Sequence, residues 1–393
     1  MEATARAVFR AYHYQEIRTP ILEETQLFAR GVGAETDIVT KEMYTFDDRD
    51  GTSLTLRPEN TASVIRAYIE HRLDQQPGVR KLYYMGPMFR RERPQKGRYR
   101  QFYQIGAEAI GSESPLVDAE VIALVVDLLE RTGLAGFQLL INSVGDQNCR
   151  PQYVERLRQE LKPVASRMCG DCQRRAETNP LRVLDCKVEA DQAIIEALPM
   201  IADHLCEACG THFDAVKKHL CDLGIAYELR PRLVRGLDYY MRTTFEVVHG
   251  SLGAQNSVLG GGRYDGLAEE LGSKVHSPGI GFSIGEDRLV MSVEGSQQPG
   301  GLELLIAPLG EPAVRHAEVL ARELRRAAFS VELAEGRLKR VMELADKLGA
   351  RFTLIVGEDE LAAGRYKLKN MSTGAQQDLT RDELAATLAA ARN

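Results

Sequence analysis

The chain has 393 residues, of which 44% are hydrophobic and 27% are charged, and its formal net charge is −6. This is the composition of a globular protein long enough for two or three domains. No apolar run is long enough to cross a membrane, and the acidic balance excludes a general polyanion binder, so nucleic acid would bind only at local basic patches. Seven cysteines, an odd number without an export signal, favour the reducing cytoplasm over a disulfide scaffold.

The first third of the chain alternates helical and β-prone patterns. Apolar residues recur at helical spacing in "TASVIRAYIEHRL", whereas "GTSLTLRPEN" alternates apolar and polar residues as a strand does. Two β-rich runs on either side of "PQKG" predict a long hairpin. In chain order we expect a helix at 1–13, a strand at 51–60, a helix at 61–73, hairpin strands at 81–89 and 98–111, a helix at 116–132 and a strand at 137–146.

The connection within this hairpin concentrates positive charge. Six basic residues lie between Arg90 and Arg100, with Glu92 as the only acid. Because residues two apart in a strand share a face, Arg90 and Glu92 would point the same way. Gln104 and Glu108 would likewise share a face of the return strand, where an amide and a carboxylate suit the N–H groups of a small ligand. A planar guanidinium suits a phosphate, although a solvated basic hairpin is the alternative.

Residues 149–227 contain long amphipathic helical stretches in place of β-rich runs, which predicts a separate, mostly helical insertion. They contain "CGDC" and "CEAC", and two such pairs can supply four thiolates to one tetrahedral zinc ion. The pairs are further apart than in the usual zinc ribbon, so reduced cysteines without metal are the favoured interpretation and zinc is the alternative. The candidate zinc ligands are Cys169, Cys172, Cys206 and Cys209. The remaining cysteines, Cys149, Cys186 and Cys221, are expected in the core.

β texture resumes after the insertion with "RGLDYYMRTTFEV". Tyr239 and Tyr240 would alternate faces, so that one packs in the core while the other lines a pocket near Arg235. The alternative is an edge strand with a structural arginine. Further on, "PGIGFSIGEDRL" runs from a strand into a helix and places Arg288 in the first helical turn. A cation there opposes the helix dipole, which suggests an anionic ligand.

Between these two segments lies the glycine-rich "GGGRYDGL" (260–267). Three consecutive glycines let the backbone approach a ligand closely. The segment has neither the spacing of a P-loop nor that of the dinucleotide-binding fingerprint. A tight turn is the alternative.

The C-terminal quarter predicts a domain of its own. "GSQQPGG" (295–301) is small, polar and glycine-rich, as is typical of a linker. Strands and helices alternate after it, which predicts a small α/β domain at 302–393 with a largely parallel core. In "GRYKLKN" the cations Arg365, Lys367 and Lys369 alternate, so they would project from one strand face toward a phosphate backbone or an RNA loop. The alternative is a solvated edge strand protected by its lysines.

Together these segments resemble the histidyl-tRNA synthetase family of class II aminoacyl-tRNA synthetases over nearly the whole chain. "MFRRERPQKGRYRQFYQIGAE" is similar to the family's class motif 2 and "GIGFSIGEDRL" to motif 3, whereas "RGLDYYMRTTFEV" and "GGGRYDGL" resemble its two signature peptides. "TDIVTKEMYTFDDRDG" and "LTLRPENTASVIRAYIEH" also match. The resemblance implies an α+β fold, with an antiparallel-sheet catalytic domain, a helical insertion and an α/β anticodon-binding domain. The expected boundaries are 1–148 and 228–294 for the catalytic domain, 149–227 for the insertion, 295–301 for the linker and 302–393 for the last domain.

The resemblance also implies a reaction: L-histidine and ATP, with Mg²⁺, form histidyl-adenylate, and tRNA(His) then accepts the histidyl group. Arg90 would hold the α-phosphate and the histidine carboxylate, Arg235 would be a second cation at the α-phosphate, and Arg288 would hold the γ-phosphate. Glu92 and Arg98 would contact adenine or the tRNA end. The residues matched to the histidine site are Glu59, Thr61 and Gln104 for the α-amino group, Glu108 and Tyr240 for the imidazole, and Tyr239 and Tyr264 for the pocket walls. Arg365, Lys367 and Lys369 would contact the anticodon stem.

Two features differ from the family pattern. Asn60 stands where the family often has glycine, a mild change. The family usually carries a further segment before the position that matches Met1, and a shorter start would weaken the homodimer that we expect in the cytoplasm. The alternative function is that of a catalytically silent, histidine-sensing regulatory relative. Such relatives typically lose the tail domain and the signature motifs, which this chain retains, so an active ligase is expected.

Overall fold

The computed structural model describes residues 1–33, 36–95, 97–252, 256–293 and 301–391. The chain divides into two compact units, Met1–Glu294 and Gly295–Asn393. The expected linker 295–301 lies outside the described residues except for Gly301. None of the described helices is long and apolar enough to span a lipid bilayer.

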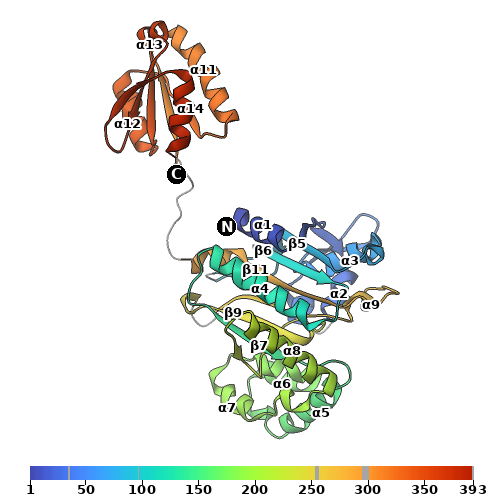
Figure 1. The fold of residues 1–393 in the computed structure, drawn as a ribbon. Helices are drawn as coiled ribbons and strands as arrows, with labels where there is room; N and C mark the ends of the chain where they lie inside the picture. Colours follow the sequence, from blue (N-terminus) through green and yellow to red (C-terminus); the bar gives the residue numbers. More distant parts are fainter. Residues whose placement is uncertain (34–35, 96, 253–255, 294–300, 392–393) are drawn as a thin grey trace. The chain divides into compact units, whose positions relative to one another are not determined.

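An eight-stranded sheet with the order β1-β5-β6-β11-β10-β9-β7-β8 forms the centre of the larger unit (Figure 1). The six strands from β5 to β7 in this order pair antiparallel, and the two-residue edge strands β1 and β8 pair parallel to their neighbours. The strands are β1 (Gln15–Glu16), β5 (Arg80–Phe89), β6 (Gln101–Ile110), β7 (Gln138–Ser143), β8 (Glu228–Leu229), β9 (Met241–Val248), β10 (Ser257–Arg263) and β11 (Gly279–Gly285). The predicted antiparallel sheet is confirmed.

The predicted hairpin is formed by β5 and β6, but its connection is longer than expected. The strands pair from Arg80↔Ile110 to Phe89↔Gln101, and one further bond joins the N–H of Arg90 to the carbonyl of Arg100 at 2.9 Å. Arg90 and Glu92 lie in the connecting loop and not in a strand, but they point to the same side, as predicted. Nη1 of Arg90 lies 3.8 Å from the carboxylate of Glu92, whereas Arg91 and Arg93 are exposed. Pro94, which has no N–H to donate, and the mutual repulsion of the loop cations both oppose further pairing.

Two helices, α1 (Glu2–Ala11) and α4 (Pro115–Arg131), cover one face of this sheet (Figure 1). Their buried side chains, such as Phe9 and Ile122, belong to one hydrophobic core with Phe282 and Val247 of the sheet. The other face carries α3 (Thr61–Glu70), whose Val64 and Ile65 pack with Tyr84. α2 (Thr25–Val32) and α9 (Leu267–Glu270) lie beside α3.

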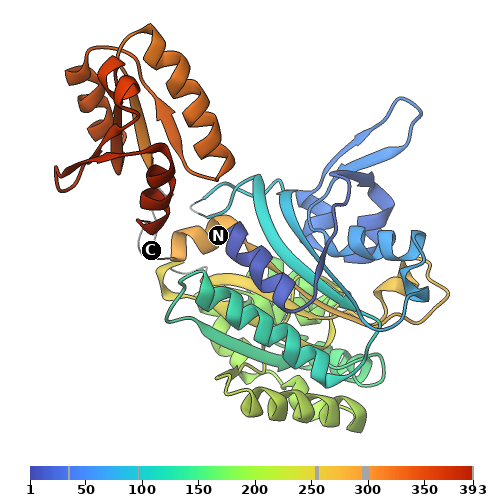
Figure 2. The ribbon, with the colours of Figure 1, turned by 45° about the horizontal axis from the view of Figure 1, so that its top comes forward.

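A second, three-stranded sheet with the order β2-β4-β3 belongs to the same unit. Its strands are β2 (Leu22–Glu24), β3 (Tyr44–Asp47) and β4 (Ser53–Leu56). The β3–β4 hairpin projects from the body of the unit (Figure 2). The strand predicted at 51–60 is shorter in the structure, since Pro58 interrupts the ladder just before α3 begins.

The stretch predicted as an insertion is helical and lies between β7 and β8. Its helices are α5 (Arg150–Leu161), α6 (Gly170–Thr178), α7 (Glu189–Ala197) and α8 (Glu207–Asp222). They enclose a core of their own around Tyr153, Leu157 and Val183. Cys149 and Cys186 are buried as expected, whereas Cys221 is exposed at the last turn of α8, so the prediction that it is a core residue is wrong.

The smaller unit is an α/β sheet with the order β13-β12-β14-β15-β16, in which β12 pairs parallel to β13 and β14. β15 and β16 add an antiparallel hairpin at one edge. The strands are β12 (Leu304–Pro308), β13 (Val331–Leu333), β14 (Phe352–Val356), β15 (Tyr366–Asn370) and β16 (Gln376–Leu379), and the helices are α11 (Glu311–Arg326), α12 (Leu338–Lys347), α13 (Glu358–Ala363) and α14 (Arg381–Ala390). The predicted parallel core is confirmed, and α13 is an element that the sequence patterns did not indicate.

Candidate active site

A cavity of about 270 Å³ lies beside the β5–β6 hairpin, and we call it the hairpin cavity. Segments far apart in the sequence line it: the start of α3, the hairpin loop, the 235–240 segment, β10 and the start of α10. The predicted site residues among its lining are Glu59, Thr61, Arg90, Glu92, Arg98, Gln104, Arg235, Tyr239, Tyr240 and Arg288. Glu108 and Tyr264 lie behind this lining.

One end of the hairpin cavity is lined by buried hydrogen-bond acceptors. Glu59 precedes α3 and accepts hydrogen bonds from the backbone N–H groups of Thr61 at 2.7 Å and Ala62 at 3.0 Å, which the first helical turn leaves without intrahelical partners. Burial raises the pKa of Glu59, although these hydrogen bonds oppose the rise. The amide oxygen of Gln104 is buried and accepts no hydrogen bond from the described residues. This end of the cavity therefore suits a ligand that donates N–H groups.

Glu108 supports this wall from behind. It is 0% exposed, and its two carboxylate oxygens accept hydrogen bonds from the hydroxyls of Thr61 at 2.8 Å and Tyr264 at 2.6 Å. Gly281 on the neighbouring strand makes room for it, because a Cβ atom there would lie 1.7 Å from Oε2 of Glu108. Burial raises the pKa of Glu108 to about 8, against the opposing effect of the two hydroxyls. Glu108 therefore affects the cavity indirectly, because it fixes the hydroxyl of Thr61, which is part of the lining.

This raised pKa predicts a pH-dependent stability. Between the unfolded value of about 4.3 and the folded value of about 8, the native state holds a proton that the unfolded state has lost, so the contribution of Glu108 falls as pH rises through this window. We expect the melting temperature of the wild type, relative to that of Glu108→Gln, to decrease steadily from about pH 5.5 to about 8.5. Calorimetry of both proteins measures the difference, and a flat difference would contradict the buried, protonated carboxyl.

Two tyrosines form an aromatic side of the cavity. The rings of Tyr239 and Tyr240 are both buried, lie 4.7 Å apart between centroids and both line the cavity. The prediction that one packs in the core and the other in the pocket is therefore wrong. The segment 235–240 is not a strand but a loop that leads into β9, so strand alternation does not apply to it. The predicted edge strand is likewise wrong, because β9 lies between β10 and β7.

Arg235 crosses the glycine run of β10. "GGGR" is a strand within the sheet and not a tight turn, and a Cβ atom on Gly260 would lie 1.8 Å from Nη2 of Arg235. Nη1 of Arg235 lies 2.5 Å from the carboxylate of Glu246 on β9. Burial opposes the positive charge, but the attraction of Glu246 together with weaker contributions from Tyr240, Asp185 and Tyr239 outweighs it and raises the pKa of Arg235. The glycine thus makes room for a guanidinium at the cavity rather than for a ligand.

Three further cations line the cavity around Glu92 and Gly97. Nε of Arg90 donates to the carbonyl of Pro58 at 2.8 Å, and Nη1 of Arg98 lies 3.0 Å from the carboxylate of Glu92. Arg288 in the first turn of α10 (Glu286–Ser292) donates to the carbonyls of Gly97 and Ser257. Burial and the nearby Arg98 lower the pKa of Arg288. Neighbouring cations of this kind are stabilised by a shared anionic ligand.

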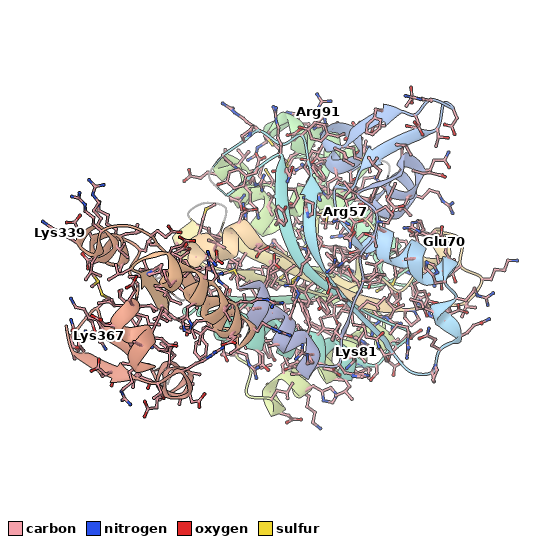
Figure 3. The ribbon with its side chains drawn as sticks, turned by 90° about the horizontal axis from the view of Figure 1, so that it is seen from above. Arg57, Glu70, Lys81, Arg91, Lys339 and Lys367 are labelled. Atoms are coloured by element: carbon pink, nitrogen blue, oxygen red, sulfur yellow. The ribbon has the colours of Figure 1, made fainter. Side chains whose placement is uncertain are left out.

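Two other arginines of the loop do not line the cavity. Arg91 and Arg93 are exposed, and Arg91 lies at the outer edge of the larger unit (Figure 3). The loop therefore divides its positive charge between the cavity and solvent.

One supporting residue escaped the sequence reasoning. Arg57, labelled in Figure 3, is 5% exposed and donates to the carbonyl of Pro87 at 3.0 Å and to the carbonyl of Thr19 at 3.0 Å. It thereby joins the segment before β2 to the β5–β6 hairpin. The side-chain oxygen of Asn60 accepts from the hydroxyl of Thr19 at 2.6 Å, so the departure from glycine at this position serves the same support and lies outside the cavity lining.

The cations predicted for the tail do not form one unoccupied face. Arg365 precedes β15 and donates to the carbonyl of Asp378 at 2.8 Å, and Lys367 lies 3.0 Å from Glu360. Lys369 is half-buried. Only Lys367 projects fully from the strand, among the described residues of β15. The three cations nevertheless alternate with the buried Tyr366 and Leu368, so the predicted shared face is confirmed. The alternative of an edge strand is wrong, because β15 lies between β14 and β16.

The four cysteines of the two CxxC pairs are not brought together. Cys169 and Cys172 lie in one cluster of side chains and Cys206 and Cys209 in another. A single zinc ion bound by all four, the alternative that the spacing left open, is excluded by this geometry.

Comparison with known proteins agrees with the sequence resemblance. The family model described as "Histidyl-tRNA synthetase" matches residues 1–289, and the model described as "Anticodon binding domain" matches residues 303–391. A histidine–tRNA ligase of Solibacter usitatus is 78% identical over 393 residues, which are 100% of this chain and 95% of that protein. A histidine–tRNA ligase of Bacillus subtilis is 48% identical over 392 residues, 98% of this chain and 92% of that protein.

Solved structures give the same result. The crystal structure of apo histidyl-tRNA synthetase from S. aureus superposes with a TM-score of 0.81 at 40% identity and covers 98% of this chain and 94% of that chain. A structure described as an ATP phosphoribosyltransferase regulatory subunit/histidyl-tRNA synthetase from Bacillus halodurans shares the fold alone, with 20% identity and a TM-score of 0.61 over 90% of this chain and 92% of that chain. The regulatory alternative is not favoured. With a class II catalytic sheet followed by an anticodon-binding domain, the chain belongs to the histidyl-tRNA synthetase family.

Proposed function

We propose that this protein is a histidine–tRNA ligase, which activates L-histidine with ATP in the hairpin cavity and transfers it to the 3′ end of tRNA(His). The observation that carries the proposal is the convergence of four arginines with buried N–H acceptors around one cavity of about 270 Å³. The two halves of the reaction need these two environments: a polar pocket for the amino acid and fixed cations for the phosphates.

The amino acid would occupy the end of the cavity beside α3. Glu59 and Gln104 would accept hydrogen bonds from its α-amino group, since both place oxygens at the lining. Thr61 would contact the same α-amino group, and Tyr240 would contact the imidazole. Glu108, predicted to read the imidazole with Tyr240, lies behind the lining, where it accepts hydrogen bonds from Thr61 and Tyr264. A ligand without matching N–H groups would leave these buried acceptors without partners, at a cost of about 1–3 kcal/mol each.

The nucleotide would occupy the cationic side. Arg90 and Arg235 would flank the α-phosphate, where negative charge develops as the histidine carboxylate attacks, and Arg288 would hold the γ-phosphate. Because these guanidinium groups are already anchored by Pro58, Glu246 and Gly97, little reorganisation is needed during the reaction. Glu92 and Arg98 would contact adenine or the tRNA end.

Class II synthetases use ATP together with a divalent metal, and we propose Mg²⁺ here. Mg²⁺ takes one or two carboxylates together with phosphate oxygens and water. Asp287 lines the hairpin cavity next to Arg288 and would supply one such carboxylate. When bound, the ion neutralises phosphate charge.

Transfer of histidine to tRNA tests the proposal as a whole. The full chain, incubated with ATP, radiolabelled histidine and a tRNA(His) transcript, should yield acid-precipitable histidyl-tRNA, and a transcript for another amino acid should give none. Failure to charge the tRNA under conditions in which the protein binds both substrates would refute the ligase assignment.

The tail cations offer a more specific prediction. If Arg365, Lys367 and Lys369 contact the anticodon stem, the triple alanine variant should raise the KM for tRNA(His) about tenfold and flatten its salt dependence, with ATP–pyrophosphate exchange unchanged. Lys339→Ala, an exposed cation on α12 of the same unit, is the matched control (Figure 3). An unchanged KM in the triple variant would place the RNA contact elsewhere.

A cytoplasmic homodimer completes the proposal. Exposed large hydrophobic residues support it: Ile21, Leu22 and Phe46 are 41%, 42% and 46% exposed on and beside the three-stranded sheet. Exposed apolar groups gathered on one small sheet are typical of a protein–protein interface.

A further inference from the structure

Each CxxC pair lies in a compact cluster with a third cysteine and an aspartate. The first cluster consists of Asp146, Cys149, Cys206 and Cys209, and the second of Cys169, Cys172, Cys186 and Asp191. In each cluster one ligand atom from every residue lies within 4.8 Å of all the others. We propose that each cluster is a structural zinc site with three thiolates and one carboxylate, so that the insertion holds two zinc ions.

The distances fit one metal ion in each cluster. At a Zn–S length of about 2.3 Å, two ligands of a tetrahedral ion lie about 3.8 Å apart. The sulfur atoms of Cys149 and Cys209 are 3.9 Å apart, and those of Cys169 and Cys186 are 3.8 Å apart. A disulfide would bring two sulfurs to about 2.05 Å. Four protein ligands complete the tetrahedron and leave no position for a substrate, as in structural zinc sites.

Both clusters have the same local construction. Cys169 and Cys206 are the residues before the first turns of α6 and α8, and Cys172 and Cys209 lie three residues further on. Neither preceding cysteine caps its helix through the side chain, a position where Ser, Thr, Asn or Asp is usual. A helix N-terminus also favours the thiolate that a metal requires. Each of the two helices therefore presents an equivalent pair of sulfur atoms toward one further cysteine and one carboxylate.

The buried aspartates supply independent support. Asp191 is 1% exposed and accepts from the backbone N–H of Cys169 at 3.1 Å and from the thiol of Cys186 at 3.3 Å. It forms no ion pair with a side-chain cation in the part of the chain that the structure describes. These hydrogen bonds satisfy the oxygens of the carboxylate but not its charge, which a divalent cation bound at this point would neutralise.

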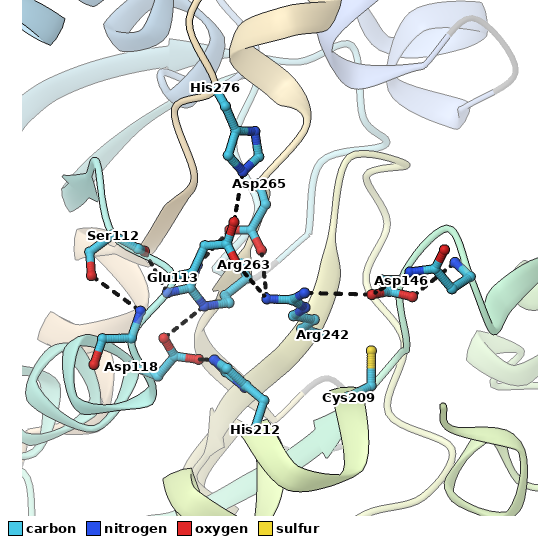
Figure 4. A network of polar contacts seen from close by, with 12 residues as sticks. Ser112, Glu113, Asp118, Asp146, Cys209, His212, Arg242, Arg263, Asp265 and His276 are labelled. Carbon is cyan, nitrogen blue, oxygen red and sulfur yellow. Dashed lines mark hydrogen bonds and ion pairs between the residues drawn. The ribbon is translucent and has the colours of Figure 1, made fainter. Parts of the chain in front are cut away.

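Asp146 connects the first cluster to the catalytic unit. One of its oxygens lies 3.6 Å from Sγ of Cys149. The other lies 3.6 Å from Nη2 of Arg242 (Figure 4). Arg242 continues to Asp265, which pairs at 2.5 Å with the fully buried Arg263 at the end of β10. The zinc ion would thus fix the base of the insertion, where α5 and α8 begin, to β10, the strand that Arg235 crosses. The second site would join α6 to α7 within the insertion.

Metal analysis of the untagged full chain tests the proposal without any variant. We expect two zinc ions per chain by mass spectrometry of the purified protein, and seven reactive thiols after denaturation in a chelator, because all seven cysteines are free. Absence of zinc with seven thiols would show ordinary reduced cysteines, and fewer than seven thiols would show disulfides. Either result overturns the proposal.

Variants then assign the ions. Cys209→Ser should remove one zinc ion per chain and Cys172→Ser the other, whereas Cys221→Ser, at the exposed cysteine outside both clusters, should retain two. A variant that leaves the zinc content unchanged overturns the site to which its cysteine belongs. In the Co²⁺-substituted wild type, thiolate-to-cobalt charge-transfer absorption should appear at two equivalents, and its absence would contradict thiolate ligation.

Discussion

Replacement of Arg235 by alanine should lower kcat for histidine-dependent ATP–pyrophosphate exchange by about 10²–10³-fold, with a small change in the KM for histidine. The reason is that Arg235 is anchored by Glu246 at 2.5 Å and reaches the hairpin cavity, where its charge would meet the α-phosphoryl group as that group gains negative charge. Its effect should therefore appear in the transition state more than in ground-state binding. Initial rates over a range of histidine concentrations measure both constants.

Two control variants distinguish a role of Arg235 in the reaction from a purely structural role. Arg235→Lys keeps the charge but not the planar, bidentate fork, so it should recover only part of the lost rate. Arg230→Ala removes an exposed arginine that pairs with Glu228 shortly before the same segment, and it should leave exchange unchanged. Wild-type kcat in Arg235→Ala would show that this guanidinium serves the structure and not the reaction.

Gly260→Ala should cause a loss of similar size, about 10²–10³-fold, with little loss of stability. The three atoms closest to an added Cβ all belong to the guanidinium of Arg235, the nearest at 1.8 Å. The end of a long side chain can move, whereas the sheet cannot, so the variant should fold with Arg235 displaced. Gly261→Ala is the contrasting variant, because its Cβ would lie 2.4 Å from the carbonyl of Gly281 and should destabilise the sheet itself.

A double-mutant cycle separates these explanations. If Gly260→Ala acts through Arg235, the double variant Gly260→Ala/Arg235→Ala should be no slower than Arg235→Ala alone. Multiplicative losses would mean that the methyl group damages the cavity independently. Melting temperatures of all three proteins establish that each is folded during the assay.

Local patterns predicted the elements that carry the site, but not the depth at which each side chain lies. The hairpin, the parallel core of the tail and the position of Arg288 in a first helical turn all follow from short-range periodicity and confirm it. The length of the loop at 90–100 does not follow from periodicity. The pairing of β5 with β6 ends at Phe89 and Gln101, because the loop cations repel one another and Pro94 has no N–H to donate. Strand alternation still sorted the side chains of this loop correctly, since Arg90 and Glu92 line the cavity whereas Arg91 and Arg93 are exposed.

Residues that act from behind the lining depend on contacts that no local pattern contains. Glu108 meets Tyr264 across 156 positions, and Arg57 meets Thr19 across 38. The cysteine clusters show the same limit, because each CxxC pair finds its third cysteine and its aspartate in other segments of the chain. The spacing of the pairs favoured reduced cysteines and left a single zinc ion as the alternative, whereas the fold separates the pairs into two clusters and adds an aspartate to each.

Histidine-dependent ATP–pyrophosphate exchange by the wild-type chain is the sharpest test of the ligase function. We expect exchange with L-histidine, none with the other standard amino acids, and competitive inhibition by histidinol, which retains the imidazole and α-amino groups but has no carboxylate to activate. Absence of exchange, while calorimetry still shows that histidine binds, would refute the ligase function and would indicate a histidine sensor.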